Sequence, residues 1–351
     1  MDSEAFRNGN NKFNPKIIFL ILGIGLLLTI FLSLLIGTYE LSISEVWGII
    51  ITRIPTIGDS ISEQFSEISK TVIWQVRFPR IVTGMLVGAA LGAAGVTVQG
   101  IFRNPLAEPY TVGVASGAAV GAVVVIYLGL VAYGSYILPL VSFFVAMVTI
   151  FAVYKIAETD GKIPVGTLLL AGIAVSLFLQ AILSVFMYLA GEELQQMVFW
   201  VMGGLWGRNW THVLLSAGPI ILGIFGIFLY SKDLDAMLLG DESAQHLGVK
   251  VEESKKILLI LSALVTAAAV AVSGVIGFVG LIIPHILRIL VGPRHKTLLP
   301  ASVFGGAIFL VWADNIARVL PAVGEVPVGI ITALAGGPFF IYLLKRRKYS
   351  Y

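Results

Sequence analysis

The sequence contains no cysteine among its 351 residues, so disulfide bonds and thiolate metal sites are excluded. Charge is also scarce, because Asp, Glu, Lys and Arg make up 12% of the chain, whereas they form about 25% of an ordinary soluble domain. Hydrophobic residues make up 58%, against about 45–50% in soluble proteins. An aqueous fold could not bury so much apolar surface, so the composition predicts a polytopic membrane protein.

Several catalytic patterns are missing as well. No G-x-x-x-x-G-K-[ST] phosphate loop occurs, so the chain does not hydrolyse nucleotide by that route. No pair of the four histidines has the i,i+4 spacing of helical metal sites, and no nucleophile–base constellation is visible. We therefore expect a chain that is not an enzyme and that has no metal site, no cofactor and no nucleic-acid partner. An intramembrane enzyme built on Asp314 or His285 is the weakest of the alternatives.

Apolar runs long enough to cross a bilayer recur along the chain. A spanning helix needs about 20 apolar residues, and the first run, 17–37, lacks an A-x-A cleavage site after it, so we interpret it as a retained span. The hydropathy pattern predicts an all-α fold with about ten transmembrane helices. The expected spans are 17–37, 81–102, 110–130, 137–154, 165–190, 213–230, 257–273, 279–291, 299–318 and 327–344.

The placement of positive charge predicts the orientation of these spans. An even number of spans puts both termini on one side, and 17 of the 23 Lys and Arg residues fall on that side, with 6 on the other. Cytoplasmic loops carry the excess of Lys and Arg. We therefore expect both termini, including the tail 1–16, in the cytoplasm. The acidic loop 38–73 would then be extracytoplasmic, and we favour a disordered insertion for it.

The stretch 84–122 contains two apolar helices on either side of a polar break, RNPLAEP (103–109). Glycine recurs every four residues in each helix, which lets backbones approach closely in a membrane. We expect two tightly packed helices with a non-helical joint between them, and the Asn-Pro step disfavours continuing the first helix. A plain tight turn is the alternative reading of the joint. The two glycine ladders are Gly84, Gly88 and Gly92, and Gly113, Gly117 and Gly121.

The predicted cytoplasmic loop 231–256 has short helical segments separated by Gly240 and Gly248. Such a loop either docks to a cytoplasmic partner or is a solvated connector, and the residues alone leave both readings open. Near the outer end of the ninth span, Asp314 and Arg318 have i,i+4 spacing and are expected to pair.

Five long motifs in order along the chain resemble the FecCD-type permeases, the membrane subunits of ABC importers for ferric siderophores, haem and cobalamin. The motifs are WQVRFPR (74–80), NPLAEPYTVGVASGA (104–118), LLGDESAQHLGV (238–249), GVIGFVGLIIPHILR (274–288) and EVPVGIITALAGGPFFIYLL (325–344).

This resemblance implies a single permease domain over 1–351 with the type II ABC importer fold, in the cell membrane. It implies a homodimer in the lipid bilayer, with separate ABC ATPase subunits on the cytoplasmic side and a solute-binding protein outside. It implies that Arg77, Arg80 and Arg318 dock the binding protein; interfacial anchoring is their alternative role. Asn104 and Leu106 would line a cytoplasmic gate. The ATPase-coupling residues would be Gly240, Asp241, Glu242, Ala244, Leu247 and Gly248.

Two functions follow as hypotheses. The first is import of a metal chelate, powered by the partner ATPase. The second is an ion-coupled secondary transporter that acts without an ATPase. Carriers of that kind usually place carboxylates near the middle of the membrane, and no predicted span has one there, which favours the first hypothesis.

Overall fold

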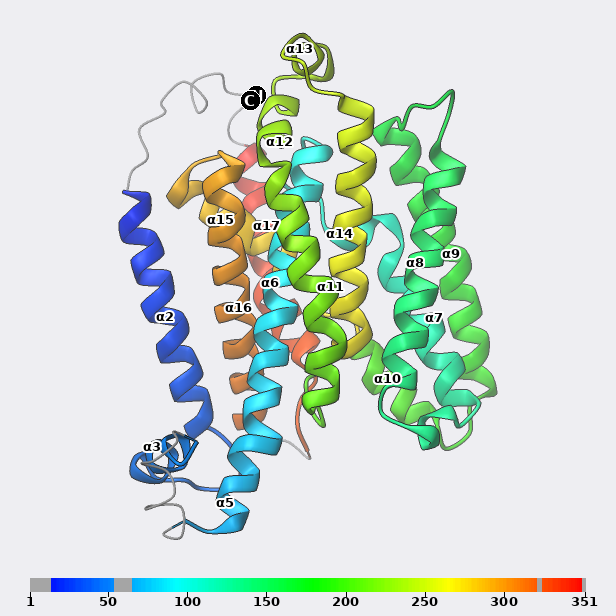
Figure 1. The fold of residues 1–351 in the computed structure, drawn as a ribbon. Helices are drawn as coiled ribbons and strands as arrows, with labels where there is room; N and C mark the ends of the chain where they lie inside the picture. Colours follow the sequence, from blue (N-terminus) through cyan, green and yellow to red (C-terminus); the bar gives the residue numbers. More distant parts are fainter. Residues whose placement is uncertain (1–13, 54–64, 321–323, 349–351) are drawn as a thin grey trace.

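The computed structural model describes residues 14–53, 65–320 and 324–348, and most of them are helical (Figure 1). Within these ranges the strand-like pairing is confined to one isolated bridge, between Thr159 and Lys162. The helices are α2 (Pro15–Leu35), α3 (Ile43–Ile51), α5 (Glu67–Thr71), α6 (Phe78–Ile101), α7 (Val114–Tyr127), α8 (Ile137–Ala157), α9 (Val165–Leu189), α10 (Leu194–Met202), α11 (Trp210–Leu229), α12 (Ser231–Met237), α13 (Asp241–His246), α14 (Val251–Ser273), α15 (Val279–Val291), α16 (His295–Val319) and α17 (Val328–Lys348).

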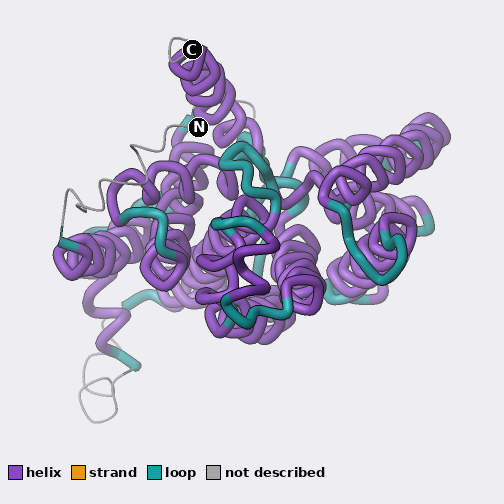
Figure 2. The backbone as a smooth tube through the Cα atoms, turned by 90° about the horizontal axis from the view of Figure 1, so that it is seen from above, coloured by secondary structure: helices purple, strands orange, loops and turns teal. Residues whose placement is uncertain are grey.

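Ten of the apolar helical segments correspond to the ten predicted spans. Seven are long and apolar enough to cross a membrane, and three shorter apolar helices, in α7, α15 and α17, complete the set among the described residues. The start of α2 and the end of α17 lie at the same end of the molecule as α13, while α3 and α5 lie at the opposite end (Figure 1). We call these the α13 end and the α3 end. Seen from above, many of the helices are viewed nearly end-on (Figure 2).

Helix α6 is the centre of the fold, because α11, α14, α15 and α16 all pack against it. Its glycines allow backbone-to-backbone contact. A Cβ atom added at Gly88 would lie 2.2 Å from the carbonyl oxygen of Gly306, and one at Gly92 would lie 2.3 Å from that of Ser302. Gly84 is less constrained, since its nearest neighbour is the end of the Leu205 side chain at 3.0 Å. The first ladder therefore packs α6 directly on α16.

The second glycine ladder packs on a different helix. A Cβ at Gly117 would lie 2.2 Å from Thr149 Oγ1, and one at Gly121 would lie 3.0 Å from the Cα of Ser142; both neighbours belong to α8. Gly113 has a positive φ of 86° where α7 begins. The expectation that the two ladder helices pack on each other is thus corrected, because the joint between them turns α7 toward α8 and α9.

The second span begins earlier than predicted. Instead of starting after Arg80, the helix runs without interruption from Glu67 to Ile101. Its segment Val72–Arg77 is a π-helix, in which the wider i,i+5 hydrogen bonding lets the helix continue through these residues. Arg77 and Arg80 consequently project from inside a helix rather than from a loop before it.

The described part of loop 38–73 is structured, which corrects the expectation of a disordered insertion. Helix α3 starts with a capping box, in which Ser42 and Glu45 satisfy each other's backbone N–H groups. Its buried Val46 and Ile49 form an apolar cluster with Leu34 at the end of α2, together with Ile73, Ile81 and Val311. Residues 54–64 lie outside the described ranges.

The α6–α16 contact predicts a large difference between two glycine substitutions. Gly88→Ala should lower the free energy of unfolding by about 1–3 kcal/mol, because its methyl group would force the two backbones apart. Gly218→Ala in α11 is the matched control, since a Cβ there meets nothing within 4 Å. Thermal unfolding in detergent, followed by circular dichroism, should show a lower midpoint for Gly88→Ala alone. Equal midpoints for the two variants would contradict the close contact.

Candidate functional site

A helical loop made of α12 and α13 projects from the α13 end of the bundle (Figure 1). Its two glycines have φ values that favour glycine, 110° at Gly240 and 86° at Gly248, so each can reverse the chain sharply. Ala244 is fully buried and anchors α13 to the loop's interior. Leu239 and Leu247 are instead 66% and 65% exposed. The loop thus holds two large apolar side chains outward, beyond the spanning helices.

Asp241, at the start of α13, forms two ion pairs that tie this loop to the rest of the chain. One carboxylate oxygen lies 3.0 Å from Arg103 Nη2 and the other lies 2.6 Å from Lys255 Nζ. Lys255 belongs to α14 and is 5% exposed, so Asp241 and Glu252 at 3.2 Å compensate a buried charge. Arg103 stands at the foot of α6, where the joint begins. Asp241 therefore links α13 directly to the start of the joint and to α14. Glu242, the next residue, is exposed.

Hydrogen bonds between Asp235 and His295 hold α12. The carboxylate of Asp235 lies 2.7 Å from His295 Nδ1 and accepts a hydrogen bond of 2.8 Å from the His295 backbone N–H, at the start of α16. Asp233 also accepts a hydrogen bond of 2.6 Å from the hydroxyl of Ser254 in α14. Both helices of the loop are thus attached to spanning helices through side chains.

The joint after α6 is a compact turn that contains both predicted gate residues. The Leu106 N–H donates to Asn104 Oδ1 at 3.0 Å, and the Asn104 N–H donates to the Gln99 carbonyl at 3.2 Å. Asn104 is exposed and Leu106 is partly buried. The two residues lie in one hydrogen-bonded turn, one and three residues after Arg103, which pairs with Asp241. Their gate role stays a prediction.

Glu108 in the joint and Tyr110 just after it hold the break between α14 and α15. The sequence did not predict these contacts. The Phe278 N–H donates to Glu108 Oε1 at 2.6 Å, and Phe278 itself has a positive φ of 69°. The Tyr110 hydroxyl donates to the Ile276 carbonyl at 2.8 Å. In the sequence, Glu108 is one residue of the polar break. Its partner, the Phe278 N–H, lies 170 residues away, so only the folded position of α15 shows the contact.

At the α3 end, the three arginines predicted to dock a partner are bonded within the subunit. Arg77 donates to the carbonyls of Leu34, in the last turn of α2, and Tyr39, just after the helix. Its side chain is buried, at 4% exposure.

Arg80 and Arg318 share one carboxylate. Asp314 accepts two hydrogen bonds from Arg80, at 2.8 and 2.9 Å, and the Arg80 Nη1 also lies 2.8 Å from Glu325. The predicted pair between Asp314 and Arg318 is present at 3.3 Å, and Arg318 also donates to the Ile36 carbonyl at 3.0 Å. Docking by these arginines stays a prediction, and it would require each guanidinium to exchange an internal partner for an external one.

Comparison with known proteins gives a consistent result. The profile described as the FecCD transport family matches residues 25–346. The cobalamin import system permease protein BtuC of Halobacterium salinarum is 45% identical over 80% of this chain and 75% of its own length. The hemin transport system permease protein HmuU of Yersinia pestis is 40% identical over 79% of this chain and 84% of its own. The molybdate import system permease protein MolB of Haemophilus influenzae is 37% identical over 95% and 97%.

A solved inward-facing structure of a chain described as a metal-chelate type ABC transporter has the same architecture. It superposes with a TM-score of 0.82 at 36% identity and covers 95% of this chain and all of its own.

The two ion pairs of Asp241 predict that this side chain holds the loop in place. Asp241→Asn should increase hydrogen–deuterium exchange of the amides over 238–249 by about tenfold, since a hydrogen bond to a charged group contributes roughly 1.5 kcal/mol. Glu242→Gln is the matched control, because it removes the same charge from an exposed neighbour. Exchange that rises equally in both variants would show that the ion pairs do not restrain α13.

Proposed function

Because this chain belongs to the FecCD transport family, we propose that it is the permease subunit of an ABC importer that carries a metal chelate into the cell. The chelate class comprises ferric siderophores, haem and cobalamin, and a separate ATPase subunit supplies the energy. The observation that supports this proposal most directly is the α12–α13 loop, an ordered module with exposed leucines and side-chain links to the helices behind it.

The exposed leucines favour a protein partner at this loop. Lipid accounts for exposed apolar residues along the spanning helices, but Leu239 and Leu247 lie on a loop outside them. Exposed large apolar residues are typical of protein interaction sites when they form one surface, and we propose that these two leucines do so. We propose that the ATPase docks here, with Gly240, Asp241, Glu242, Ala244, Leu247 and Gly248 forming the coupling segment.

The contacts behind the loop supply a route for coupling. When the ATPase displaces α13, Asp241 moves Arg103 at the start of the joint. The turn holding Asn104 and Leu106 follows, and it opens or closes the cytoplasmic gate. Glu108 and Tyr110 carry the same movement to the break before α15. The pathway thereby alternates between the two sides, and weakly binding walls let a large solute leave.

The remaining partners follow from the same proposal. The α13 end faces the cytoplasm of the cell, so both termini are cytoplasmic, and the solute-binding protein docks at the α3 end. Two copies of the chain form a homodimer in the cell membrane. The exposed apolar side chains of α9 and α17, such as Leu177 and Leu334, meet lipid or the second copy.

Reconstitution distinguishes the importer from an ion-coupled carrier. The chain is placed in liposomes alone, or together with the ATPase and binding protein encoded with it, and uptake of cobalamin, haem and ferric hydroxamate is measured. We expect uptake when ATP and both partners are present and none with an ion gradient alone. Uptake driven by a proton or sodium gradient without the ATPase would overturn the importer proposal.

A charged residue in the proposed docking surface should uncouple the complex. Leu247→Asp should reduce co-purification of the ATPase at least about tenfold, because it places a carboxylate where apolar surface is to be buried. Gln245→Asp adds the same charge at an exposed position inside α13, two residues before Leu247, and serves as the control. Circular dichroism should be unchanged in both variants. Full ATPase binding by Leu247→Asp would contradict docking at this surface.

A further inference from the structure

Arg208 differs from the other positively charged residues expected on the outer side of the chain. Lys70 pairs with Glu67 at 2.7 Å, and Arg53 lies 5.2 Å from the centre of the Trp74 ring. Arg77, Arg80 and Arg318 are bonded to carbonyls or carboxylates as described above. In the described part of the chain, Arg208 has neither a carboxylate within ion-pair distance nor a carbonyl bonded to its guanidinium.

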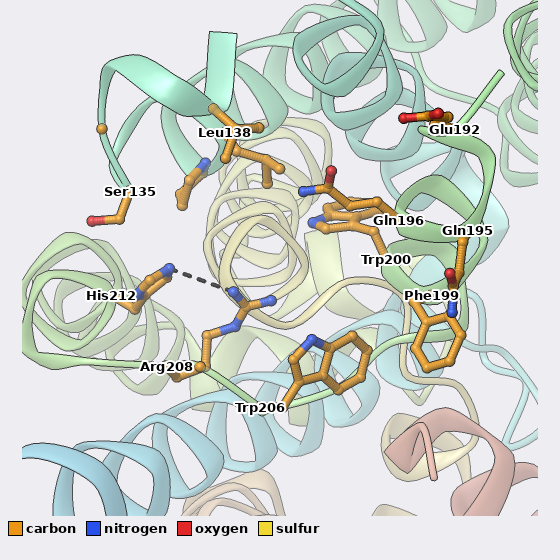
Figure 3. Close-up of a pocket in the computed structure, with 14 residues that line it drawn as sticks. Ser135, Leu138, Glu192, Gln195, Gln196, Phe199, Trp200, Trp206, Arg208 and His212 are labelled. Atoms are coloured by element: carbon orange, nitrogen blue, oxygen red, sulfur yellow. Dashed lines mark hydrogen bonds between the residues drawn. The ribbon is translucent and has the colours of Figure 1, made fainter. Parts of the chain in front are cut away.

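The guanidinium of Arg208 points into a cavity at the α3 end of the bundle (Figure 3). The cavity has a volume of about 490 Å³ and lies between the start of α8, helix α10 and the start of α11. This volume is in the range of small-ligand sites, about 300–1,000 Å³. Aromatic and polar side chains both form its wall. The walls include Leu138, Gln196, Phe199, Trp200, Trp206 and His212.

Two buried hydrogen-bond donors in this cavity have no acceptor in the described part of the chain. They are Nε of Arg208 and Nε1 of Trp200, and Trp200 is only 5% exposed. The guanidinium makes one long contact, 3.5 Å from its Nη1 to His212 Nε2, and Asn209 holds the other ring nitrogen of His212 at 2.9 Å. Buried donors without an acceptor cost free energy that a suitable ligand would recover.

The charge of this site also lacks compensation. Burial, together with the positive charge of the neighbouring Arg80, lowers the pKa of Arg208 to about 10. The guanidinium therefore remains charged at neutral pH, in surroundings that disfavour a cation. The cavity's acidic residue, Glu192, is exposed and forms no ion pair with the guanidinium in the described part of the chain.

We propose that this cavity binds a compact oxyanion group, a phosphate or a carboxylate. The planar guanidinium of Arg208 binds such groups through paired hydrogen bonds, and the Trp200 indole N–H supplies a further donor. The rings of Phe199 and Trp206 pack on the apolar part of the molecule that carries the anion. The source is either a soluble oxyanion or the headgroup of an anionic lipid, because aromatic and basic residues at helix ends suit both.

Binding measurements on the full-length chain in a neutral detergent test this proposal and distinguish the sources. One titration uses inorganic phosphate. The other uses mixed micelles that contain phosphatidylglycerol, with micelles of zwitterionic phosphatidylcholine as the reference without net charge. Saturable binding of phosphate would identify a soluble ligand, whereas saturation by phosphatidylglycerol alone would identify a lipid. Either result supports the site, and no binding of either probe overturns it.

Substitutions then locate the binding. Arg208→Gln should raise the dissociation constant at least about tenfold, since a charged hydrogen-bond pair is lost. Trp200→Phe removes one N–H donor and should weaken binding by a smaller factor. Lys70→Gln is the matched control, because it removes a positive charge from the same end and should leave binding unchanged.

Arg208→Lys covers the case in which the glutamine variant does not fold. It keeps the charge but loses the planar pair of donors, so binding should weaken to an intermediate degree. The assignment to this cavity would be overturned if the single variants Arg208→Lys and Trp200→Phe both kept wild-type affinity. A loss of affinity in Lys70→Gln would also overturn it.

Discussion

The close approach of the α6 backbone to its neighbours is the constraint on which the rest of the structure depends. Gly88 contacts the carbonyl of Gly306, and Gly92 contacts the carbonyl of Ser302. A Cβ atom added at Gly95 would lie 1.9 Å from the carbonyl oxygen of Gly280. Without side chains between them, α15 and α16 lie directly against α6. This contact fixes where α15 begins, and the Glu108 and Tyr110 side chains reach the break before it only because of that position.

Polar side chains inside the bundle follow from the same packing. A charged group in an apolar interior needs a partner, since its loss of hydration is otherwise uncompensated. Arg80 on α6 meets Asp314 on α16 because the glycine contacts bring the two helices together, and Glu325 adds a second carboxylate. The arginines at this end thus connect α2, α6 and α16. These buried charged groups hold helices together.

Local features of the sequence predicted most of the architecture, whereas distant contacts escaped it. The spans, the joint at 103–109 and the short helices of loop 231–256 each depend on neighbouring residues, so hydropathy, proline and glycine were sufficient. The Arg80–Asp314 pair joins residues 234 positions apart, and the cavity around Arg208 forms only when α8, α10 and α11 meet. Helix α3 was missed because the acidic composition of 38–73 outweighed its short apolar stripe.

Helix α2 is synthesised long before the helix it packs against. It packs mainly against α16, and its Ser33 and Thr29 accept hydrogen bonds from Asn315 and Trp312, which follow more than 280 residues later. The ribosome therefore releases α2 into the bilayer long before its partner exists. Because its sequence is nearly all apolar, α2 is stable in the bilayer as an independent helix. Its Thr29 hydroxyl meanwhile donates to the Gly25 carbonyl of the same helix. Helix α2 thus enters the membrane well before α16, the helix it packs against, has been made.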